Sequence, residues 1–399
     1  MSGWQTVRLG DFLAPVRDPI SIVDGHEYTQ ITVRIKGRGL ALRRRAKGSE
    51  IATKRQFLAR TGQLLVSKID ARNGGLGLVP PELDGGIVSG DFPVFDIDGA
   101  VCQPEYLELV VSRTEFWDEC LGVSEGSTNR VRLVPEQFLD LEVDVPPLTE
   151  QARIVGAVDV LRRQASATTR LRAACAQLYR AAREERIEEP DWDRALLSDV
   201  ITSIAGGRSP KCHDRPPAEG EWGVLKVSAI RDGEFRPAEA KALPAEIQPT
   251  PRFAVRRGDL LYSRANTAQL VGAMCRIERD FPRLLLCDKT MRVTLDEESV
   301  SADYLVHATG VLSVREQVEI AAGGTSESMK NISQPAFLDV EISLPPVGEQ
   351  HRISRELSAM RTATQLLDDE LGRLGGLRSA LVEELVSGLR PAPPLRSAA

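Results

Sequence analysis

Apolar and small residues recur every three or four positions along two stretches of about forty residues each. This spacing is typical of a helix that buries a narrow stripe against a second helix. Forty residues of helix rise by about 60 Å, and a stripe of that length needs a partner. The simplest arrangement pairs the two stretches, antiparallel if globular parts lie at opposite ends; packing of each helix on its own globular part stays open. The stripes consist of Ile154, Val158, Leu161, Ala165, Thr168, Leu171, Cys175, Leu178 and Ala182, and of Ile353, Leu357, Met360, Thr364, Leu367, Leu371, Leu374, Leu377, Leu381 and Leu385.

Both stretches begin at the same motif. Residues 145–154 read Val-Pro-Pro-Leu-Thr-Glu-Gln-Ala-Arg-Ile, and residues 344–353 read Leu-Pro-Pro-Val-Gly-Glu-Gln-His-Arg-Ile. The prolines disfavour a helix before them, and the glutamate suits the positive end of the helix dipole that follows. Similar segments precede both motifs in the same order, which predicts an internal duplication of one unit. These segments are 138–140 with 337–339, 62–67 with 258–263, and Trp4 with Trp192.

The residues before each motif show short, mixed patterns. Residues 29–35, 62–69 and 87–97 are rich in β-branched or alternating apolar residues, as strands are, with Gly90 marking a bulge. Residues 105–120 instead have helical spacing. We therefore predict that each half is a globule of the α+β class.

The composition is that of a globular protein in solution. Of 399 residues, 42% are hydrophobic and 27% are charged. No run approaches the eighteen or so apolar residues of a membrane span, and the start lacks a signal-peptide pattern, so a cytoplasmic location is expected. The six cysteines are scattered without a C-x-x-C pair, which indicates neither a disulfide framework nor a zinc site. The adjacent Cys212 and His213 do not change that view.

The usual catalytic motifs are absent from the sequence. It contains no G-x-x-x-x-G-K-[ST], H-E-x-x-H or G-x-S-x-G motif, and no Asn-Pro-Pro-aromatic motif of an amino-methyltransferase. The glycine-rich residues 74–77 lack a strand-to-helix setting and indicate a tight turn. Asp232, Glu239 and Lys241 have a nuclease-like spacing that often arises by chance. We expect a protein that binds rather than an enzyme, with no metal ion and no cofactor.

Positive charge is unevenly distributed in a chain whose net charge is −6. Residues 28–49 contain seven cationic residues and no acidic one, which suits contacts with several phosphates. In both halves a Gly-x-Leu-Leu-x-Ser strand precedes a loop with arginine and asparagine, side chains able to read guanine and adenine. The candidate DNA-binding residues are Arg34, Lys36, Arg38, Arg43, Arg44, Arg45, Lys47, Lys68, Arg72 and Asn73 in the first half, and Arg208, Lys211, Lys226, Arg231, Arg264 and Asn266 in the second.

Two unlike globules joined by duplicated Pro-Pro-x-x-Glu-Gln-x-Arg-Ile helices resemble the specificity subunit of type I restriction-modification systems. The resemblance covers essentially the whole chain and is most specific at the two junctions. Residues 62–73 and 258–266 are also similar to segments of that family's target recognition domains. One departure is that residues 28–49 are far more basic than their counterpart in the second half, so the two readers need not share affinity equally.

The resemblance implies a fold, a function and a set of partners. The fold would be two similar target recognition globules, 1–148 and 191–347, joined by helices 149–190 and 348–390 in an antiparallel coiled coil with a pseudo-two-fold repeat, followed by a disordered tail, 391–399. Each globule would read one half of a bipartite, asymmetric sequence in double-stranded DNA; half-sites one turn of duplex apart, about 34 to 36 Å, would lie within the span of the helices. The paired helices would dock two methyltransferase subunits, which recruit restriction subunits in an antiviral defence complex. The expected partner-binding residues are Glu150, Gln151, Arg153, Glu349, Gln350 and Arg352.

Two other functions remain open from the sequence. A nuclease acting alone would use the Asp232, Glu239 and Lys241 trio, and Asp232→Ala would abolish cutting. A structural coiled-coil scaffold without DNA readout would be indifferent to Arg72→Ala and Arg264→Ala. The sequence gives neither the DNA target nor the half-site spacing, nor the stoichiometry of the complex.

Overall fold

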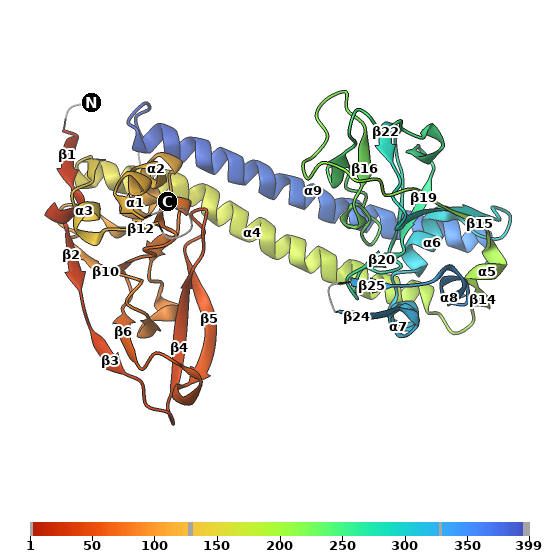
Figure 1. Cartoon of the computed structure of the whole chain (residues 1–399), viewed down its shortest axis with the longest axis horizontal. Coiled ribbons are helices and arrows are strands. Elements are labelled where there is room, and N and C mark those ends of the chain that lie inside the picture. Colours follow the sequence, from red (N-terminus) through yellow and green to blue (C-terminus); the bar gives the residue numbers. More distant parts are fainter. Residues whose placement is uncertain (1–2, 127–130, 327–328, 394–399) are drawn as a thin grey trace, which may run out of the picture. The chain divides into compact units, whose positions relative to one another are not determined.

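The structure is a computed structural model that describes residues 3–126, 131–326 and 329–393 (Figure 1). It divides into two compact units. Unit 1 comprises Met1–Thr169 together with Asp369–Ala399, and unit 2 comprises Arg170–Asp368. Both units contain helices and strands, in agreement with the predicted α+β class. In the described part of the chain, no helix has the length and apolar character that crossing a membrane requires.

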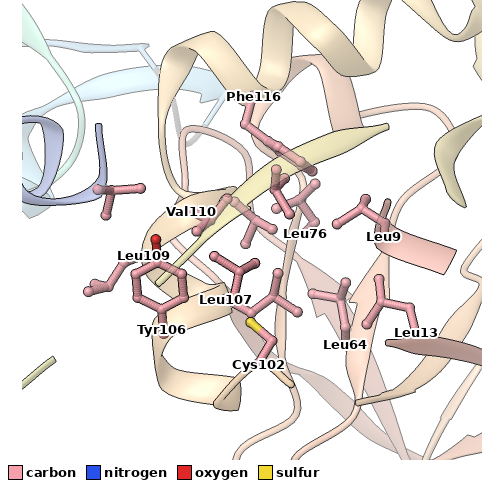
Figure 2. Close-up of a cluster of buried hydrophobic side chains, with 14 of the residues drawn as sticks. Leu9, Leu13, Leu64, Leu76, Cys102, Tyr106, Leu107, Leu109, Val110 and Phe116 are labelled. Atoms are coloured by element: carbon pink, nitrogen blue, oxygen red, sulfur yellow. The ribbon is translucent and has the colours of Figure 1, made fainter. Parts of the chain in front are cut away.

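The inner part of unit 1 is a four-stranded sheet packed against short helices. The strand order is β2-β10-β7-β8, and the pair β1–β13 lies beside it as a separate antiparallel ladder. Figure 2 shows side chains from the strands, from the 3-10 helix Leu9–Asp11 and from α1 and α2 meeting in one core, among them Leu9, Leu64 and Leu107. The elements are β1 (Gln5–Arg8), β2 (Leu13–Val16), β7 (Leu64–Val66), β8 (Leu76–Leu78), β10 (Val94–Ile97), α1 (Pro104–Val111), α2 (Thr114–Gly122), β11 (Ser124–Glu125), β12 (Arg132–Leu133), α3 (Pro135–Leu139) and β13 (Glu142–Val145).

The outer part of unit 1 is a five-stranded sheet of order β3-β6-β9-β4-β5. Its edge strand β5 forms a long antiparallel hairpin with β4. Its inner face shares a small core with the other sheet, through residues such as Ile31, Leu65 and Val94. The strands are β3 (Pro19–Ser21), β4 (Glu27–Val33), β5 (Leu40–Lys47), β6 (Arg55–Ala59) and β9 (Gly86–Val88).

Two predictions for this half are wrong in detail. Residues 87–97 form two strands, β9 and β10, in different sheets, because a turn closed by Phe92 N donating to Ser89 O (3.0 Å) interrupts them. Residues 105–120 form two helices, because Arg113 has extended backbone angles and starts a new helix. In both places the apolar pattern of the sequence continues past the point where one strand or helix ends and the next begins.

Unit 2 repeats the inner architecture. Its strand order β15-β23-β19-β21 corresponds to β2-β10-β7-β8, and β14–β26 corresponds to β1–β13. The elements are β14 (Arg194–Leu196), α5 (Leu197–Val200), β15 (Ile201–Gly206), β19 (Leu260–Ser263), β21 (Met274–Arg276), β23 (Thr290–Leu295), α6 (Ala302–Ala308), α7 (Leu312–Ala321), α8 (Gln334–Leu338) and β26 (Glu341–Ser343).

The repeat extends to single hydrogen bonds. Tyr106 Oη donates to Asp144 O (3.0 Å), and Tyr304 Oη donates to Ser343 O (2.8 Å). Burial raises the pKa of both tyrosines. The duplication inferred from sequence is therefore present in the three-dimensional structure of the inner parts.

The outer part of unit 2 differs from that of unit 1. It is a four-stranded sheet of order β17-β16-β22-β18, in which β16 and β22 are parallel, and a separate three-stranded sheet β20-β25-β24 lies nearby in the same unit. The strands are β16 (Gly223–Leu225), β17 (Ala240–Ala242), β18 (Ala254–Val255), β20 (Ala265–Asn266), β22 (Phe281–Leu285), β24 (Gly323–Ser326) and β25 (Met329–Asn331).

Two helices of 40 residues each, α4 (Leu148–Ile187) and α9 (Val347–Val386), contribute to both units. In unit 1, Ile154 and Val158 near the start of α4 share a core with Val382 and Leu385 near the end of α9. In unit 2, Ile187 at the end of α4 shares a core with Leu357 near the start of α9. Within each unit, then, the beginning of one helix meets the end of the other.

The stripe predicted along α4 is displaced by one residue in its second part. Leu171 and Leu178 are 54% and 60% exposed, and the neighbouring Arg172 and Tyr179 are half-buried instead. A regular alternation of four and three residues from Ile154 passes through positions 172 and 179, so Leu171 and Leu178 lie one position off the buried stripe. On α9, Leu377 is likewise 56% exposed.

The beginning of the tail predicted to be disordered is ordered. Ala392 is buried, and its backbone N–H donates to Glu150 Oε1 (3.1 Å). Arg153 donates to Ala392 O and to Pro393 O. Residues 394–399 of that predicted tail lie outside the described residues.

Candidate nucleic-acid interface

The β4–β5 hairpin carries the basic segment predicted from sequence. Arg34, Lys36, Arg38, Arg43, Arg44, Arg45 and Lys47 are all exposed, and none of them forms an ion pair with a described residue. The strand register shifts between Gln30 and Ile31, so Arg43 is an extra residue in β5. Such a bulge lets successive arginines point outward instead of alternating in and out.

Only some of these cations are held in place by the protein. Arg44 Nε donates to Gln30 Oε1 (3.0 Å), and its Nη2 donates to Glu50 O (3.3 Å). Arg34 Nη2 makes a long contact with Leu40 O (3.4 Å). The remaining five cationic side chains have no polar partner among the described residues, so their charges are available to phosphates.

The structure joins the hairpin turn to the loop that carries Arg72 and Asn73. Lys36 N donates to Asn73 O (2.6 Å), and Gly37 N donates to Gly74 O (3.1 Å). The loop is the short 3-10 helix η3 (Ala71–Asn73), which ends at Gly74 in a left-handed conformation, φ +74°. The tight turn predicted at residues 74–77 is observed only at Gly74, because Gly77 already lies in β8. The two hydrogen bonds bring together two candidate groups that are distant in sequence.

The ring of Trp117 on α2 supports this junction, and sequence reasoning missed it. A Cβ atom at Gly74 would lie 2.5 Å from Trp117 Cε2, and one at Gly37 would lie 3.1 Å from Trp117 Cζ2. Trp117 Nε1 donates to Val111 O (2.9 Å), which fixes the ring. The paired glycines were the available signal, because glycine is needed where backbone approaches a ring this closely.

Lys68, Arg72 and Asn73 differ in exposure. Lys68 and Arg72 are half-buried, and Asn73 is exposed. None has a side-chain hydrogen bond or ion pair within the described structure, so all three retain free donors. Ser67 Oγ accepts from Asp70 N (3.1 Å), which shapes the turn between them.

The equivalent loop of unit 2 is arranged differently. Asn266 is 6% exposed; its Nδ2 donates to Val227 O (3.0 Å) and Ser263 Oγ (3.2 Å), and its Oδ1 accepts from Thr267 N. Its hydrogen-bonding groups are used inside the protein, so the prediction that Asn266 reads a base is wrong. Arg264 is half-buried, with a buried Nε that has no partner.

The other candidates of unit 2 form no continuous basic surface comparable to the hairpin. Arg208 and Lys211 are exposed without ion pairs, whereas Lys226 lies 3.6 Å from Glu239. Arg231 is half-buried and its Nε has no partner. The unequal basic character of the two halves, visible in sequence, therefore persists in the fold.

The nuclease-like trio is not assembled into a site. Asp232 pairs with Arg183 (2.6 Å), and Lys241 pairs with Asp214 (2.8 Å). Glu239 accepts from Ser228 Oγ (2.7 Å), a hydrogen bond that lowers the pKa of its carboxyl. Among the residues that the structure describes, no group of three or more potential ligands could hold a metal ion.

The glutamines of the two junction motifs are structural. Gln151 is fully buried; its Oε1 accepts from Gln103 N (2.7 Å), and its Nε2 donates to Val101 O and Pro146 O. Gln350 makes the same three bonds, with Ser301 N, Ser299 O and Pro345 O. Neither has surface left for a partner, so their assignment as partner-binding residues is wrong.

The charged residues of the motifs remain partly accessible. Glu150 and Arg153 pair with each other at 2.6 Å and hold the returning C-terminal segment. Glu349 and Arg352 form the matching pair, also at 2.6 Å, and both are half-exposed. The repeat thus keeps a buried amide and an ion pair at each helix start.

Comparison with known proteins gives relatives of one kind. No protein-family model matches the chain. A segment of 163 residues, 41% of this chain and 27% of the relative, is 33% identical to the type I restriction enzyme EcoEI specificity subunit of Escherichia coli. Over 302 residues, 69% of this chain and 64% of the relative, it is 23% identical to the EcoKI specificity subunit of Escherichia coli strain K12. The matches span less than two thirds of either relative.

Solved structures extend the similarity of fold to nearly the whole chain. The S subunit of a type I restriction-modification system from M. genitalium matches with a TM-score of 0.54 at 9% identity, covering 98% of this chain and 97% of that one. A chain from work on complex assembly and conformational transition of a type I system matches with a TM-score of 0.54 at 20% identity, covering 97% and 98%. The chain is therefore a relative of the specificity subunits of type I restriction-modification systems, as its two junction motifs predicted.

Proposed function

We propose that this chain is the DNA sequence-specificity subunit of a type I restriction-modification complex and has no catalytic activity of its own. The observation that carries the proposal is the β4–β5 hairpin, where seven exposed cations lie free of ion pairs in a chain with a net charge of −6. Such charges bind the phosphate backbone and position a protein on duplex DNA. The adjoining loop adds Arg72 and Asn73, whose free donors suit base edges.

The two units would read different halves of one bipartite, asymmetric target. Their inner sheets have the same strand order, whereas their outer sheets differ in strand number and direction. A common base with unlike outer sheets suits two readers that are positioned alike but recognise different bases. We therefore propose target recognition domains at residues 1–148 and 191–347, with helices 149–190 and 348–390 forming an antiparallel coiled coil between them.

The helices would also dock two methyltransferase subunits, through which restriction subunits join the complex. Leu171 and Leu178 on α4 support this, because both are more than half exposed on a helix whose other face is packed. Glu349 and Arg352 at the start of α9 add partly accessible charges. Exposed apolar side chains next to charges are typical of protein interfaces.

Methylome sequencing tests the proposal. A host expressing this chain with its cognate methyltransferase should carry modified adenines at one bipartite sequence, and the methyltransferase alone should leave none. The triple variant Arg43→Ala, Arg45→Ala, Lys47→Ala should still assemble but methylate a smaller fraction of sites. Assembly with the methyltransferase but no modified bipartite motif would reject the specificity function.

A further inference from the structure

Unit 1 contains a cavity of about 680 Å³ at one end of the space between its two sheets. Val16 on β2 and Phe95 on β10 line it from the inner sheet, and Phe57 on β6 lines it from the outer sheet. Its volume lies within the range of about 300 to 1,000 Å³ that small-molecule sites occupy. None of the residues assigned above to the DNA interface lines it except Lys68.

The walls of the cavity are apolar and aromatic. Phe57 and Phe92 are half-buried, so part of each side chain faces the open space. Gly90 adds no side chain there, and a Cβ atom at this position would lie 3.6 Å from the Phe57 ring. Half-buried aromatic side chains next to a glycine leave room for a flat ring to stack.

The rim of the cavity is positively charged. Arg17, Arg55 and Lys68 line it, and none of them has an ion pair or a side-chain hydrogen bond within the described structure. Arg55 and Phe57 lie two residues apart on β6 and therefore point to the same face of the sheet. Glu136 is the one acidic residue of the lining. Cations next to aromatic walls suit a ligand that combines an anionic group with a planar ring.

In a basic cavity of unit 2, by contrast, the cationic side chains are paired with carboxylates. It is lined by Lys226, Lys241 and Lys289, and each of these lysines has a carboxylate partner, Glu239, Asp214 and Asp288 respectively. An internal carboxylate competes with any anionic ligand for the lysine. The excess of unpaired charge therefore distinguishes the cavity of unit 1.

We propose that the cavity of unit 1 binds one nucleotide, with the base against Phe57 and Phe92 and the phosphate at Arg17, Arg55 and Lys68. The nucleotide comes either from a DNA strand or from free mononucleotide. Binding of a nucleotide within a DNA strand rests on the proposed DNA-specificity function, and Lys68 connects the two because it also precedes the loop that carries Arg72 and Asn73. Binding of a free mononucleotide does not depend on the proposed function.

Fluorescence of 2-aminopurine separates the two sources, because stacking on an aromatic ring quenches it. One titration uses the free 2-aminopurine deoxynucleoside 5′-monophosphate with the full chain. A second uses a short single-stranded oligothymidylate with one central 2-aminopurine. The uncharged 2-aminopurine deoxynucleoside is the control for the phosphate contribution. Duplex binding is measured in parallel, so that failure of the cavity and failure of the proposed function give different results.

We expect saturable quenching with the nucleotide and weak or no quenching with the nucleoside. Phe92→Ala should weaken binding by about fivefold or more, since a stacked base contributes that much in nucleic-acid sites. Arg55→Ala, at an exposed position, should weaken it without affecting the circular dichroism spectrum. Arg257→Ala, which removes an exposed cation without an ion pair from unit 2, is the matched control and should bind like the wild type.

The outcomes of the titrations either support or overturn nucleotide binding in the cavity. Quenching by the oligonucleotide alone identifies a strand as the source, and quenching by the free nucleotide identifies a mononucleotide site. Duplex binding without quenching in either titration overturns the cavity inference and leaves the proposed function intact. Equal affinity for nucleoside and nucleotide, or wild-type binding by both Phe92→Ala and Arg55→Ala, also overturns it.

Discussion

Gln151 and Gln350 are single buried amides, each of which connects the start of a long helix to backbone groups of its own unit. Each lies one residue after the glutamate of a junction motif and satisfies one backbone N–H and two carbonyl oxygens. A residue that completes three buried polar groups is costly to remove, because those groups cannot regain water. The glutamine of each motif thus holds the start of the long helix against its own unit through buried hydrogen bonds.

Replacing either glutamine should destabilise its unit. Gln151→Ala leaves the N–H of Gln103 and two carbonyls without partners, and we expect a loss of at least about 2 kcal/mol in the free energy of unfolding. Gln164→Ala, at an exposed position of the same helix, should change it by less than about 0.5 kcal/mol. Urea denaturation followed by circular dichroism measures both. Equal stability of Gln151→Ala and wild type would show that the bonds are dispensable.

His307 should make unit 2 less stable in mild acid. The side chain is fully buried, with Nδ1 3.0 Å from Tyr179 Oη and Nε2 3.0 Å from Ser358 Oγ. Burial, reinforced by Arg361 and Arg183, lowers its pKa from 6.5 to about 3. The unfolded chain therefore binds a proton below pH 6.5 that the folded chain does not, so stability falls as the pH drops from about 6.5 towards 3.

The titration of His307 should lower the free energy of unfolding by about 1.4 kcal/mol at pH 5.5 relative to pH 8. His307→Gln removes that contribution, so the gap in unfolding free energy between wild type and variant should narrow by this amount from pH 8 to pH 5.5. Between pH 7.5 and 8.5 the gap should stay constant, which serves as the control. A gap independent of pH throughout would contradict the assignment.

At this scale, the sequence predicted residue types better than their environments. Asn73 and Asn266 follow equivalent strands, yet Asn73 is exposed and Asn266 is saturated by Val227, Ser263 and Thr267. The difference depends on a segment distant in sequence, since the side chain of Asn266 donates to Val227 O in the 3-10 helix Val227–Ala229. Local spacing carries no information about that tertiary contact.

The long helices show what periodicity can and cannot predict at the scale of elements. The start of each helix was predicted to within one residue, because a proline pair marks it. The ends were predicted three and four residues too late, at 190 and 390, whereas the helices end at Ile187 and Val386. The phase of the seam was wrong at Leu171 and Leu178, where Arg172 and Tyr179 occupy the packed side. Arg172 instead pairs with Asp368 at 3.0 Å, and Tyr179 contacts His307.

The packed side of α9 can be tested with a pair of leucines. Leu385 is 1% exposed in the core of unit 1, whereas Leu377 on the same helix is 56% exposed. Leu385→Asp should cost at least about 3 kcal/mol, since it empties a core position and buries a carboxylate. Leu377→Asp should cost less than about 1 kcal/mol. Thermal unfolding compares them, and similar midpoints for the two variants would contradict the observed helix phase.

The β4–β5 hairpin was predictable as a basic segment but not as an assembled surface. Its joining to the Ala71–Gly74 turn depends on backbone hydrogen bonds and on Trp117, which lies far away in sequence. The short strands β9 and β10 were merged for a similar reason, because an apolar pattern does not reveal which sheet a strand joins.

Removing cations from the hairpin should lower DNA affinity in a salt-dependent way. Arg43→Ala and Arg45→Ala should each reduce the slope of log K against log salt by about one, as expected for one phosphate contact per side chain. Arg60→Ala is the control, since Arg60 is exposed but paired with Asp18 (3.4 Å). The titration uses the complex that we propose this chain forms with its methyltransferase, on duplex DNA that carries the motif found by methylome sequencing. An unchanged slope in both variants would exclude the hairpin from the interface.

At the scale of the whole molecule, the duplication explains both the similarity and the difference of the two units. The inner sheets, the buried glutamines and the tyrosine hydrogen bonds recur, because both copies must support a helix start. The outer sheets lack that constraint and have diverged into different strand orders. The repeated sequence segments predicted the similarity of the inner sheets. The difference between the outer sheets depends on pairing between distant segments, which no local pattern specifies.

Unit 2 is one uninterrupted stretch of chain, whereas unit 1 draws Val382, Leu385, Val386 and Ala392 from the far end of the polypeptide. During synthesis on the ribosome, the half made first therefore cannot complete its core until the half made second has left the exit tunnel. We expect a nascent chain that ends at residue 368, followed by a flexible linker long enough to fill the exit tunnel, to protect unit 2 from protease while residues 1–169 remain sensitive. Early protection of residues 1–169 would show that they fold without the returning segment.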